Sequence, residues 1–453
     1  MKAETMNRSE FLKMSAAAVT GMSLSALSAK SYARVEGANE RLKIGIVGSS
    51  ERGRGALLPA LFKVEKAMNA ELTAVCDVWS VNLEKGIQLV KTRTGRTPAG
   101  YRHLDEMLDS GIDGVIVATG DPQHAPLLAR VVNSGKDCYC EKPMAINVPM
   151  AKEAVQAVKR TGRIVQIGTQ GLSDPRLWGL KKFIASGKLG KISHVEQVQS
   201  YWGPRWRGRG EVALIKEKDT DWKEWLRSYP ERPFDPRLYF EYRIYKDFST
   251  GIAGQWMSHQ VAAVALAMGE TFPYSVSSDG GIFVWQDGRE TPDVLAAHVI
   301  YPSGWMYTYT CNFGTDYPRH ERYCGLNGTI EQTPEGYVVS GIGGGTEDSP
   351  RNREREKNSS GTGQGQFVNA NKIKEKSVIP PEGGTPGDRD PIPAHIQNWL
   401  ECVRSRKTPN ADIMSGYYHS VACIMAHQSG YVGRKLYWDR RKEEIVNTPP
   451  DRA

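Results

Sequence analysis

Cysteine is scarce in this sequence: its 453 residues include 7 cysteines, and no two of them are spaced C-x-x-C. Cys138 and Cys140 form a C-x-C pair inside an apolar stretch, a spacing that suits neither a disulfide nor a zinc site. The odd number of cysteines also argues against a disulfide framework. We therefore predict buried thiols, no disulfide scaffold and no metal site.

The sequence also lacks a stripe of one charge. Its 59 basic and 51 acidic residues give a net charge of +8, and the cations are scattered apart from Arg205, Arg207 and Arg209. No continuous nucleic-acid surface follows from this pattern, so we expect no nucleic-acid partner. A mildly basic protein that attracts anionic ligands is the simpler interpretation. A hydrophobic fraction of 40% is typical of soluble globular proteins, and the length favours two domains.

The N-terminus has no apolar run long enough to span a bilayer, but it has the pattern of an export signal. "MNRSEFLKMSAAAVTGMSLSALSAKSYA" passes from a basic start through an Ala/Ser-rich stretch to small residues ending at Ala33. It resembles a twin-arginine signal, with Arg8 and Ser9 where two arginines are expected. We predict a signal peptide over 1–33 and a periplasmic protein delivered folded, with its cofactor bound. An ordinary secretory signal, a start at Met6, and a non-functional signal that leaves the protein cytoplasmic are the alternatives.

Residues 41–168 alternate between strand and helix patterns. "RLKIGIVG", "AELTAVCDVW", "DGVIVATGD", "KDCYCEKP" and "RIVQIGTQ" are short apolar runs, as expected of buried parallel strands. "APLLARVVNSG" and "MAKEAVQAVKRTG" indicate helices closed by glycine. This alternation predicts the α/β class, with a doubly wound parallel sheet of the Rossmann type.

The first turn of this region indicates dinucleotide binding. Gly48, Ser50 and Gly53 occupy the three fingerprint positions of G-x-G-x-x-G, where backbone N–H groups can meet a pyrophosphate. Asp77 ends the second strand, where a carboxylate can accept both ribose hydroxyls and repel a 2′-phosphate, so we predict NAD. Arg52 is the rival indication for NADP, and a sheet without a cofactor is the alternative. The residues predicted to hold the cofactor here are Gly48, Ser49, Ser50, Arg52, Gly53 and Asp77.

Three further motifs follow in order: "ATGDPQHAPLL", "CYCEKPMA" and "VQIGTQ". In this order they resemble the Gfo/Idh/MocA family of oxidoreductases, of the exported, glucose–fructose oxidoreductase-like and inositol dehydrogenase-like type. The resemblance continues through "DWKEWL" and "HIQNWLECVRSRKTPNAD" to "GRKLYWD". It implies that Lys142 lies at the nicotinamide beside the substrate, where a cation can hold the hydroxyl being oxidised. It also implies that the cofactor is lined by Thr119, Asp121, His124, Glu141, Lys142 and Gln170.

A histidine lies within "GIAGQWMSHQVAAVALAMG", whose pattern from Trp256 to Met268 predicts a helix. Gln255 and His259, four apart, would then share a face. Relatives have an aspartate at the first position, and the pair exchanges a proton with the substrate; a glutamine can hold a hydroxyl or orient the ring but cannot take up that proton. The resemblance implies that His259 is a general base titrating near neutral pH.

The missing aspartate leaves several possibilities. We nominate Asp247 as the substitute carboxylate. The loss of the aspartate could instead mark an elimination reaction or a binding protein without turnover. A histidine satisfied within the core is the structural alternative.

The remainder predicts an α+β domain over 169–392. "ISHVEQVQSYW", "VLAAHVIYP" and "WMYTYTCNF" alternate apolar and polar residues, as in a large, mainly antiparallel sheet. We expect one face to form the substrate wall and the other a homodimer or homotetramer interface. The polar, glycine-rich stretch 341–390 predicts a flexible loop. The resemblance implies that 393–453 is a helical segment packing back on the first domain. Aromatic residues between 200 and 245 suit sugar rings, although aromatic core is their commoner use; they include Trp202, Trp206, Trp222, Trp225, Tyr239 and Tyr242.

These features together predict an NAD-dependent oxidoreductase. It would transfer hydride between the nicotinamide and a hydroxyl or keto carbon of a sugar, a sugar derivative or a cyclitol, without membrane insertion. One alternative is a redox-assisted glycoside hydrolase or lyase acting through a transient 3-keto sugar, as the related NAD-dependent glycosidases imply. Another is a non-catalytic protein that binds a sugar or the cofactor.

Overall fold

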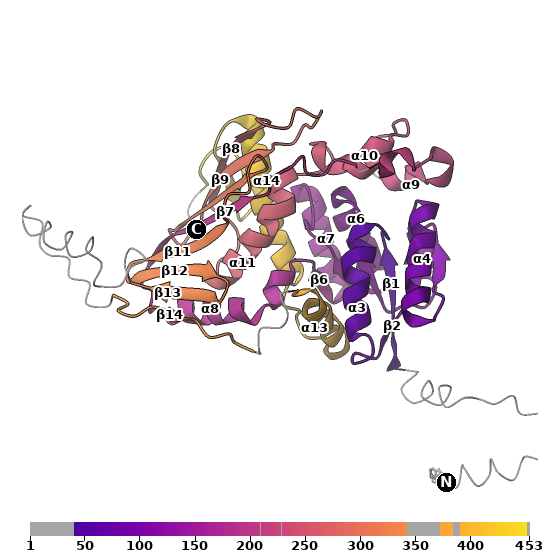
Figure 1. The fold of residues 1–453 in the computed structure, drawn as a ribbon, viewed down its shortest axis with the longest axis horizontal. Helices are drawn as coiled ribbons and strands as arrows, with labels where there is room; N and C mark the ends of the chain where they lie inside the picture. The colour runs from indigo at the N-terminus through magenta and orange to yellow at the C-terminus, as the bar shows by residue number, and fades with distance from the viewer. Residues whose placement is uncertain (1–39, 209, 228, 342–371, 384–389, 451–453) are drawn as a thin grey trace, which may run out of the picture. The chain divides into compact units, whose positions relative to one another are not determined.

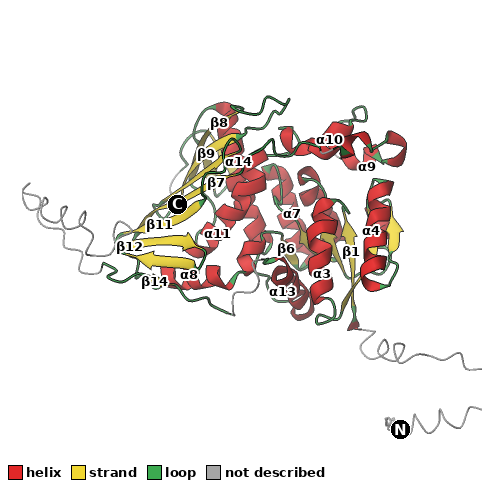
Figure 2. Ribbon diagram, in the orientation of Figure 1, coloured by secondary structure: helices red, strands yellow, loops and turns green. Residues whose placement is uncertain are grey.

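The computed structural model describes residues 40–208, 210–227, 229–341, 372–383 and 390–450. The predicted signal peptide over 1–33 lies outside these residues. From Leu42 onward the chain forms one structural unit that contains two sheets. Figure 1 follows the chain through both, and Figure 2 separates its helices from its strands.

The first sheet is parallel and has six strands in the order β3-β2-β1-β4-β5-β6. This order confirms the doubly wound prediction, and its direction of winding changes between β1 and β4, where such sheets bind ligands. The strands are β1 (Leu42–Val47), β2 (Ala70–Cys76), β3 (Ala99–Tyr101), β4 (Gly114–Val117), β5 (Asp137–Cys140) and β6 (Val165–Ile167). The helices of this part are α3 (Leu58–Val64), α4 (Ser80–Thr94), α5 (Leu104–Leu108), α6 (His124–Asn133) and α7 (Val148–Thr161).

Side chains of the central strands are buried on both faces of this sheet, which explains their continuous apolar runs. On β5, Tyr139 packs in the core with α3, while Cys138 and Cys140 pack on the opposite face with α6 and α7. Every cysteine is free, and Cys324 alone is not fully buried. The prediction of buried thiols therefore holds for six of the seven cysteines.

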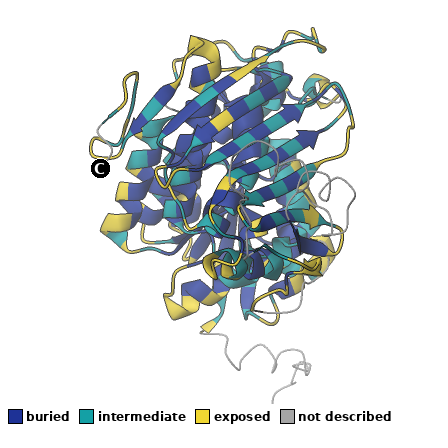
Figure 3. Ribbon diagram, turned by 90° about the vertical axis from the view of Figure 1, so that its left-hand side faces the viewer, coloured by how far each residue is buried: buried dark blue, intermediate teal, exposed yellow. Residues whose placement is uncertain are grey.

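The second sheet has ten strands in the order β14-β13-β12-β11-β7-β10-β9-β8-β15-β16. It is mainly antiparallel, as predicted, with a parallel pairing between β7 and β10. Its longer strands alternate between buried and partly exposed residues, which Figure 3 shows along the sheet. The strands are β7 (Ile192–Ser200), β8 (Ser275–Gly281), β9 (Val294–Ile300), β10 (Met306–Asn312), β11 (His320–Gly325), β12 (Gly328–Thr333), β13 (Gly336–Ser340), β14 (Ser377–Val378), β15 (Leu436–Asp439) and β16 (Glu444–Val446).

The buried face of the second sheet is the candidate for the expected substrate wall. It packs in one continuous apolar core with α11 (Ser258–Met268), α14 (Ile413–Val432) and the first sheet, while α8 (Pro175–Ala185) contacts α11 and β13. Polar side chains also lie on this face: Gln197 of β7 donates to Glu321 of β11 and to Gln260 of α11, so the sheet supports the helix that carries His259.

Two predictions for the C-terminal part need correction. Within the predicted loop 341–390, the described residues 372–383 include β14, which pairs with β13, so this portion is not a free loop; 342–371 and 384–389 lie outside the described residues. The segment 393–453 is not wholly helical, because β15 pairs with β8 and β16 with β15. Pairings of two or three residues near the ends of a sheet leave little signal in the sequence.

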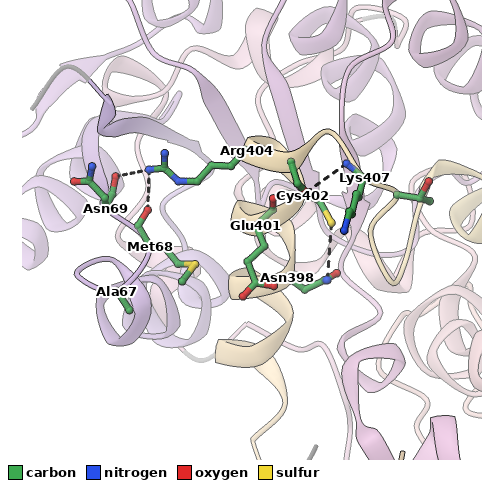
Figure 4. Close-up of a pocket in the computed structure, with 10 residues that line it drawn as sticks. Ala67, Met68, Asn69, Asn398, Glu401, Cys402, Arg404 and Lys407 are labelled. Atoms are coloured by element: carbon green, nitrogen blue, oxygen red, sulfur yellow. Dashed lines mark hydrogen bonds between the residues drawn. The ribbon is translucent and has the colours of Figure 1, made fainter. Parts of the chain in front are cut away.

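The amphipathic helix predicted from "IPAHIQNWLECVRS" is α13 (Ile392–Ser405), and it packs against α3 of the first domain. Arg404 donates to the carbonyl oxygens of Met68 and Asn69 at 2.9 and 3.0 Å, as Figure 4 shows. Arg406, just after the helix, forms an ion pair of 2.6 Å with Asp137 at the start of β5. Through α13 and Arg406, the C-terminal segment packs on the first domain.

A small aromatic cluster covers one end of the first sheet. We call residues 217–227 and 229–248 the aromatic cover; it includes α9 (Trp222–Leu226) and α10 (Pro236–Glu241), which Figure 1 shows beside α4 and α6. Asp221 N–H donates to the Val78 carbonyl at 2.9 Å. Half of the six aromatic residues considered for sugar contact are core residues of this cover, namely Trp222, Trp225 and Tyr242.

Candidate active site

The glycine fingerprint forms a tight turn at the end of β1. Gly48 has φ of +90°, and a Cβ there would lie 2.6 Å from the Ala118 carbonyl, so a side chain is excluded. A Cβ on Gly53 would lie 2.5 Å from the Gly48 carbonyl oxygen. A π-helical turn, Gly53–Leu57, then leads into α3. The turn therefore has the close approach of backbone to backbone that a dinucleotide-binding loop requires.

Asp77 lies directly after β2, as predicted, and its side chain faces the fingerprint turn. Its carboxylate accepts the N–H groups of Ser49 and Trp79 at 2.7 and 2.9 Å. Burial raises the pKa of Asp77 to about 6, although these hydrogen bonds and the nearby Arg54 and Arg102 act in the opposite direction. The Tyr239 hydroxyl also hydrogen-bonds to this carboxylate, whose remaining lone pairs can accept a ribose hydroxyl.

Three buried hydroxyl groups around this end of the sheet have no partner among the described residues: those of Ser49, Thr119 and Thr169. They follow β1, β4 and β6, so they line the carboxyl ends of the parallel strands. Unsatisfied buried hydroxyls are uncommon: that of Ser49 faces Gly86 of α4, and a polar ligand at this edge would satisfy those of Thr119 and Thr169. Together with Gly48 and Asp77, they fit a dinucleotide such as NAD.

Glu141 and Arg52 are paired at the opposite side of the turn. The Arg52 guanidinium lies 2.7 Å from Glu141 Oε1, and Gln170 donates to the same oxygen at 2.9 Å and to the Tyr139 hydroxyl at 2.7 Å. Burial acts to raise the pKa of Glu141, but the Arg52 ion pair outweighs it and the pKa is lowered. Arg52 is therefore bound to the loop after β5 and is not directed to a 2′-phosphate beside Asp77.

His124, predicted to line the cofactor, has a different place. Its Nδ1 lies 2.8 Å from the Pro143 carbonyl and its Nε2 3.1 Å from the Thr119 carbonyl. The side chain is 1% exposed. It therefore joins the loops that follow β4 and β5, and it positions cofactor-lining residues without facing the cofactor itself.

Lys142 is held over the start of the helix that carries His259. Its Nζ donates to the backbone carbonyl of Gln255 at 2.6 Å. Burial lowers the pKa of Lys142 to about 8; Glu141 and Asp121 act against this, while Arg243 and Arg52 add to it. An amine with this pKa can exchange a proton near physiological pH.

Gln255 lies between a carboxylate and a guanidinium. Its amide N–H donates to Asp121, and its Oε1 accepts from Arg243 Nε at 2.9 Å. Asp121 also accepts the Ser249 hydroxyl at 2.7 Å. Since a carboxylate requires a donor and a guanidinium an acceptor, these two neighbours determine the orientation of the amide.

The predicted helix begins with a π-helical turn, Ala253–Met257, before α11. The Ser258 N–H bonds to the Ala253 carbonyl, five residues back, so the regular spacing assumed for Gln255 and His259 does not hold in this turn. The amide of Gln255 bonds to Asp121 and Arg243 and makes no hydrogen bond with His259 among the described residues. The expectation that it orients the ring directly is therefore not met.

His259 lies on α11 close to Lys142. Burial lowers its pKa well below the ordinary value, and Lys142, Arg52, His419 and His395 add to the effect. This corrects the expectation of titration near neutrality. The ring is neutral at physiological pH, and in that form it can accept a proton.

Asp247, the nominated substitute carboxylate, is exposed. It lines a cavity with His427 and Tyr431 of α14. The carboxylate that contacts Gln255 is Asp121, so the structure favours Asp121 over Asp247 for that role.

Sequence reasoning missed Arg243 and Ser249. Both lie in "YRIYKDFST", which has no spacing typical of a site, and only the fold brings them to Asp121 and Gln255. In the described part of the chain, no cluster of His, Cys, Asp or Glu could hold a metal ion, and no helix is long and apolar enough to cross a membrane.

Comparison with known proteins agrees with this geometry. Residues 42–169 match the sequence profile described as the Gfo/Idh/MocA oxidoreductase family, NAD-binding Rossmann fold. Residues 42–169 therefore match the NAD-binding domain of the Gfo/Idh/MocA family. The matched residues run from β1 to the turn after β6, so they include the fingerprint, Asp77 and Lys142.

Curated relatives match about a third of the chain or less. An inositol 2-dehydrogenase from Rubrobacter xylanophilus is 31% identical over 157 residues, 34% of this chain and 43% of that protein. A scyllo-inositol 2-dehydrogenase (NAD(+)) from Bacillus subtilis is 35% identical over 83 residues, 18% of this chain and 24% of that protein. The chain thus spans less than half the length of these relatives.

Solved structures share the fold over both sheets. An aldose-aldose oxidoreductase from Caulobacter crescentus, complexed with glycerol, has a TM-score of 0.62 and 17% identity, covering 88% of this chain and 99% of that chain. The WlbA dehydrogenase from Chromobacterium violaceum, in complex with NADH and UDP-GlcNAcA, has a TM-score of 0.62 and 19% identity, covering 88% and 96%. At these identities the likeness supports the fold alone.

Proposed function

We propose that this protein is an NAD-dependent oxidoreductase that acts on a sugar, a sugar derivative or a cyclitol. The observation that carries the proposal is the position of Lys142. It follows the carboxyl end of β5 and reaches the first turn of the helix that bears His259. An amine and a neutral imidazole beside a dinucleotide turn form a site suited to oxidation of a hydroxyl group.

The residues divide the work as follows. Gly48 and Gly53 leave the backbone open to a pyrophosphate, Asp77 accepts ribose hydroxyls, and Arg52 holds Glu141 next to Lys142. The nicotinamide supplies the hydride acceptor when NAD is bound.

Lys142 donates a hydrogen bond to the substrate oxygen. Neutral His259 takes the hydroxyl proton as the C–H bond gives up its hydride, which leaves a carbonyl group. In the reverse direction the imidazolium returns the proton.

One observation favours a second candidate, a redox-neutral reaction in which NAD stays bound. The aromatic cover lies over the ribose end of the site: the Trp79 ring, next to Asp77, is 5.5 Å from Phe240 and 6.0 Å from Tyr239. A closed cover would slow exchange of the cofactor. A bound cofactor that is reduced and reoxidised within one turnover suits a glycoside hydrolase or lyase that proceeds through a keto sugar.

The test is the cofactor content of natively purified protein, followed by turnover. We expect bound NAD, and NADH formation with a cyclitol or an aldose such as myo-inositol or D-glucose. Cleavage of a glycoside without net NADH would favour the redox-neutral candidate. Protein that neither contains nor binds NAD would contradict both, and would favour a binding protein.

We further propose export to the periplasm and a homo-oligomer. The predicted signal over 1–33 supports the first proposal, and the partly exposed outer face of the ten-stranded sheet supports the second. Cell fractionation and light scattering test them. Uncut protein in the cytoplasm would contradict export, and a monomeric mass would contradict the oligomer.

A further inference from the structure

We propose that the substrate of this site carries a carboxylate, which Arg243 binds beside Lys142. The substrate class is then a hydroxy acid of the sugar or cyclitol type. This inference rests on the proposed oxidoreductase function and narrows its substrate class. It is carried by the charges and hydrogen bonds around Gln255.

The side chains around Gln255 carry more positive than negative charge. Lys142 and Arg243 are both bound to Gln255, one through its backbone carbonyl and the other through its side chain. Neither cation has a carboxylate within ion-pair distance in the part of the chain that the structure describes, whereas Arg52 is paired with Glu141. Asp121 is the remaining carboxylate, so two cations face one anion.

The charge of Asp121 is also satisfied by other groups. It accepts hydrogen bonds from Ser249 Oγ at 2.7 Å, from the Gln255 amide, and from the Tyr242 hydroxyl at 3.4 Å. Asp121 is 1% exposed, while Lys142 and Arg243 are both partly exposed. The cations, and not the anion, are therefore the groups that a ligand meets.

The guanidinium of Arg243 is positioned to bind a planar anion. Its Cζ lies 4.5 Å from the centre of the Tyr242 ring, and its Nε bonds to Gln255. No described residue accepts a hydrogen bond from its two terminal nitrogens. A stacked guanidinium with its terminal nitrogens available presents a fork that matches a carboxylate.

The charge and the spacing both favour one carboxylate. A single negative charge balances the site, whereas a phosphate group, with about 1.5 to 2 charges at neutral pH, would overcompensate it. The two cations lie apart by no more than the length of one glutamine residue and two hydrogen bonds. A molecule of hexose size can therefore place its carboxylate on Arg243 and a hydroxyl on Lys142.

The experiment compares matched acids and neutral sugars on NAD-loaded protein. Calorimetry measures the Kd of D-glucuronate against D-glucose, of D-galacturonate against D-galactose, and of D-glucose 6-phosphate, and NADH formation is followed with the same compounds. We expect the acids to bind about 10- to 100-fold more tightly than the neutral sugars, as a charge-assisted pair gives. Added salt should weaken this preference.

Arg243→Met should remove the preference for acids, and Arg243→Lys should retain part of it because the charge stays while the fork is lost. Arg319→Met is the matched control: its guanidinium stacks at 4.0 Å on Tyr201 but does not bond to Gln255. It should leave the ratio of acid to neutral binding unchanged. Thermal melting of each variant shows whether it folds. If Arg243→Met does not fold, the binding ratio of Arg243→Lys still tests the proposal.

The outcomes separate this inference from the proposed function. Equal binding of acid and neutral sugar, a preference for the phosphate, or a preference that survives in Arg243→Met would each overturn the carboxylate site. If NADH still forms with neutral sugars in those cases, the proposed oxidoreductase function is retained and only the carboxylate site is rejected. Protein that binds glucuronate through Arg243 but never binds NAD would support the carboxylate site and contradict the proposed reaction.

Discussion

Replacing Lys142 with methionine should make the protein more stable and nearly inactive. The ammonium is disfavoured in its partly buried position: the pKa of Lys142 falls from 10.5 to about 8. That difference corresponds to about 3 kcal/mol at pH 7. Methionine has a similar length and no charge, so it avoids this cost. The variant also loses the hydrogen bond from Nζ to the Gln255 carbonyl, about 1 kcal/mol, which leaves a net gain of about 2 kcal/mol.

The gain should depend on pH in a defined direction. Because the folded-state pKa of Lys142 is depressed, its cost is fully present below pH 8 and disappears as the pH rises through 10.5, where the unfolded chain also loses the proton. At pH 9 about 2 kcal/mol of the cost remains. After the contribution of the lost hydrogen bond is subtracted, the free energy of unfolding of Lys142→Met should exceed that of the wild type by about 1 kcal/mol at this pH.

Urea-induced unfolding at pH 7 and pH 9, followed by circular dichroism, measures the free energy of unfolding in both proteins. Lys188→Met, at an exposed surface lysine, is the control and should change stability by less than about 0.5 kcal/mol at either pH. NADH formation by Lys142→Met should fall by about 100-fold or more. A variant less stable than the wild type at pH 7, or a gain that does not shrink by pH 9, would refute the reasoning.

Three further predictions concern neighbouring residues. His259→Gln should reduce turnover by about 100-fold or more while NAD affinity, measured by calorimetry, stays the same. A variant with wild-type turnover would show that His259 is a structural core residue. Gln255→Glu should place a second carboxylate against Asp121 and raise the pKa of the pair. The free energy of unfolding should therefore fall by about 1–3 kcal/mol at pH 8 and by less at pH 5. Equal urea midpoints of variant and wild type at both pH values would contradict this prediction. NAD affinity should fall about 10-fold from pH 7 to pH 5 as Asp77, with its pKa of about 6, takes up a proton, and Asp77→Asn should lose this dependence; a pH-independent Kd in the wild type would exclude Asp77 as the ribose acceptor.

The sequence alone was sufficient for the first domain. Apolar runs that end at Gly48, Asp77 and Lys142 predict buried parallel strands, and the parallel sheet brings their carboxyl ends to one edge. Local patterns also predict the bounds of α13, because its apolar residues repeat with a helical period in one continuous stretch that begins at prolines. In the structure, this helix ends at Arg406, which has a left-handed backbone conformation. These features depend on neighbours in the chain.

Only the tertiary structure decided the partners of the site. Gln255 binds Asp121 and Arg243, and Lys142 bonds to the Gln255 backbone, contacts that join positions far apart in the sequence. The π-helical turn at Ala253–Met257, the place of His124 between two loops, and the exposure of Asp247 also leave no local pattern. Each depends on how a side chain packs against distant elements, and burial then determines which of the charged groups keeps its ordinary pKa.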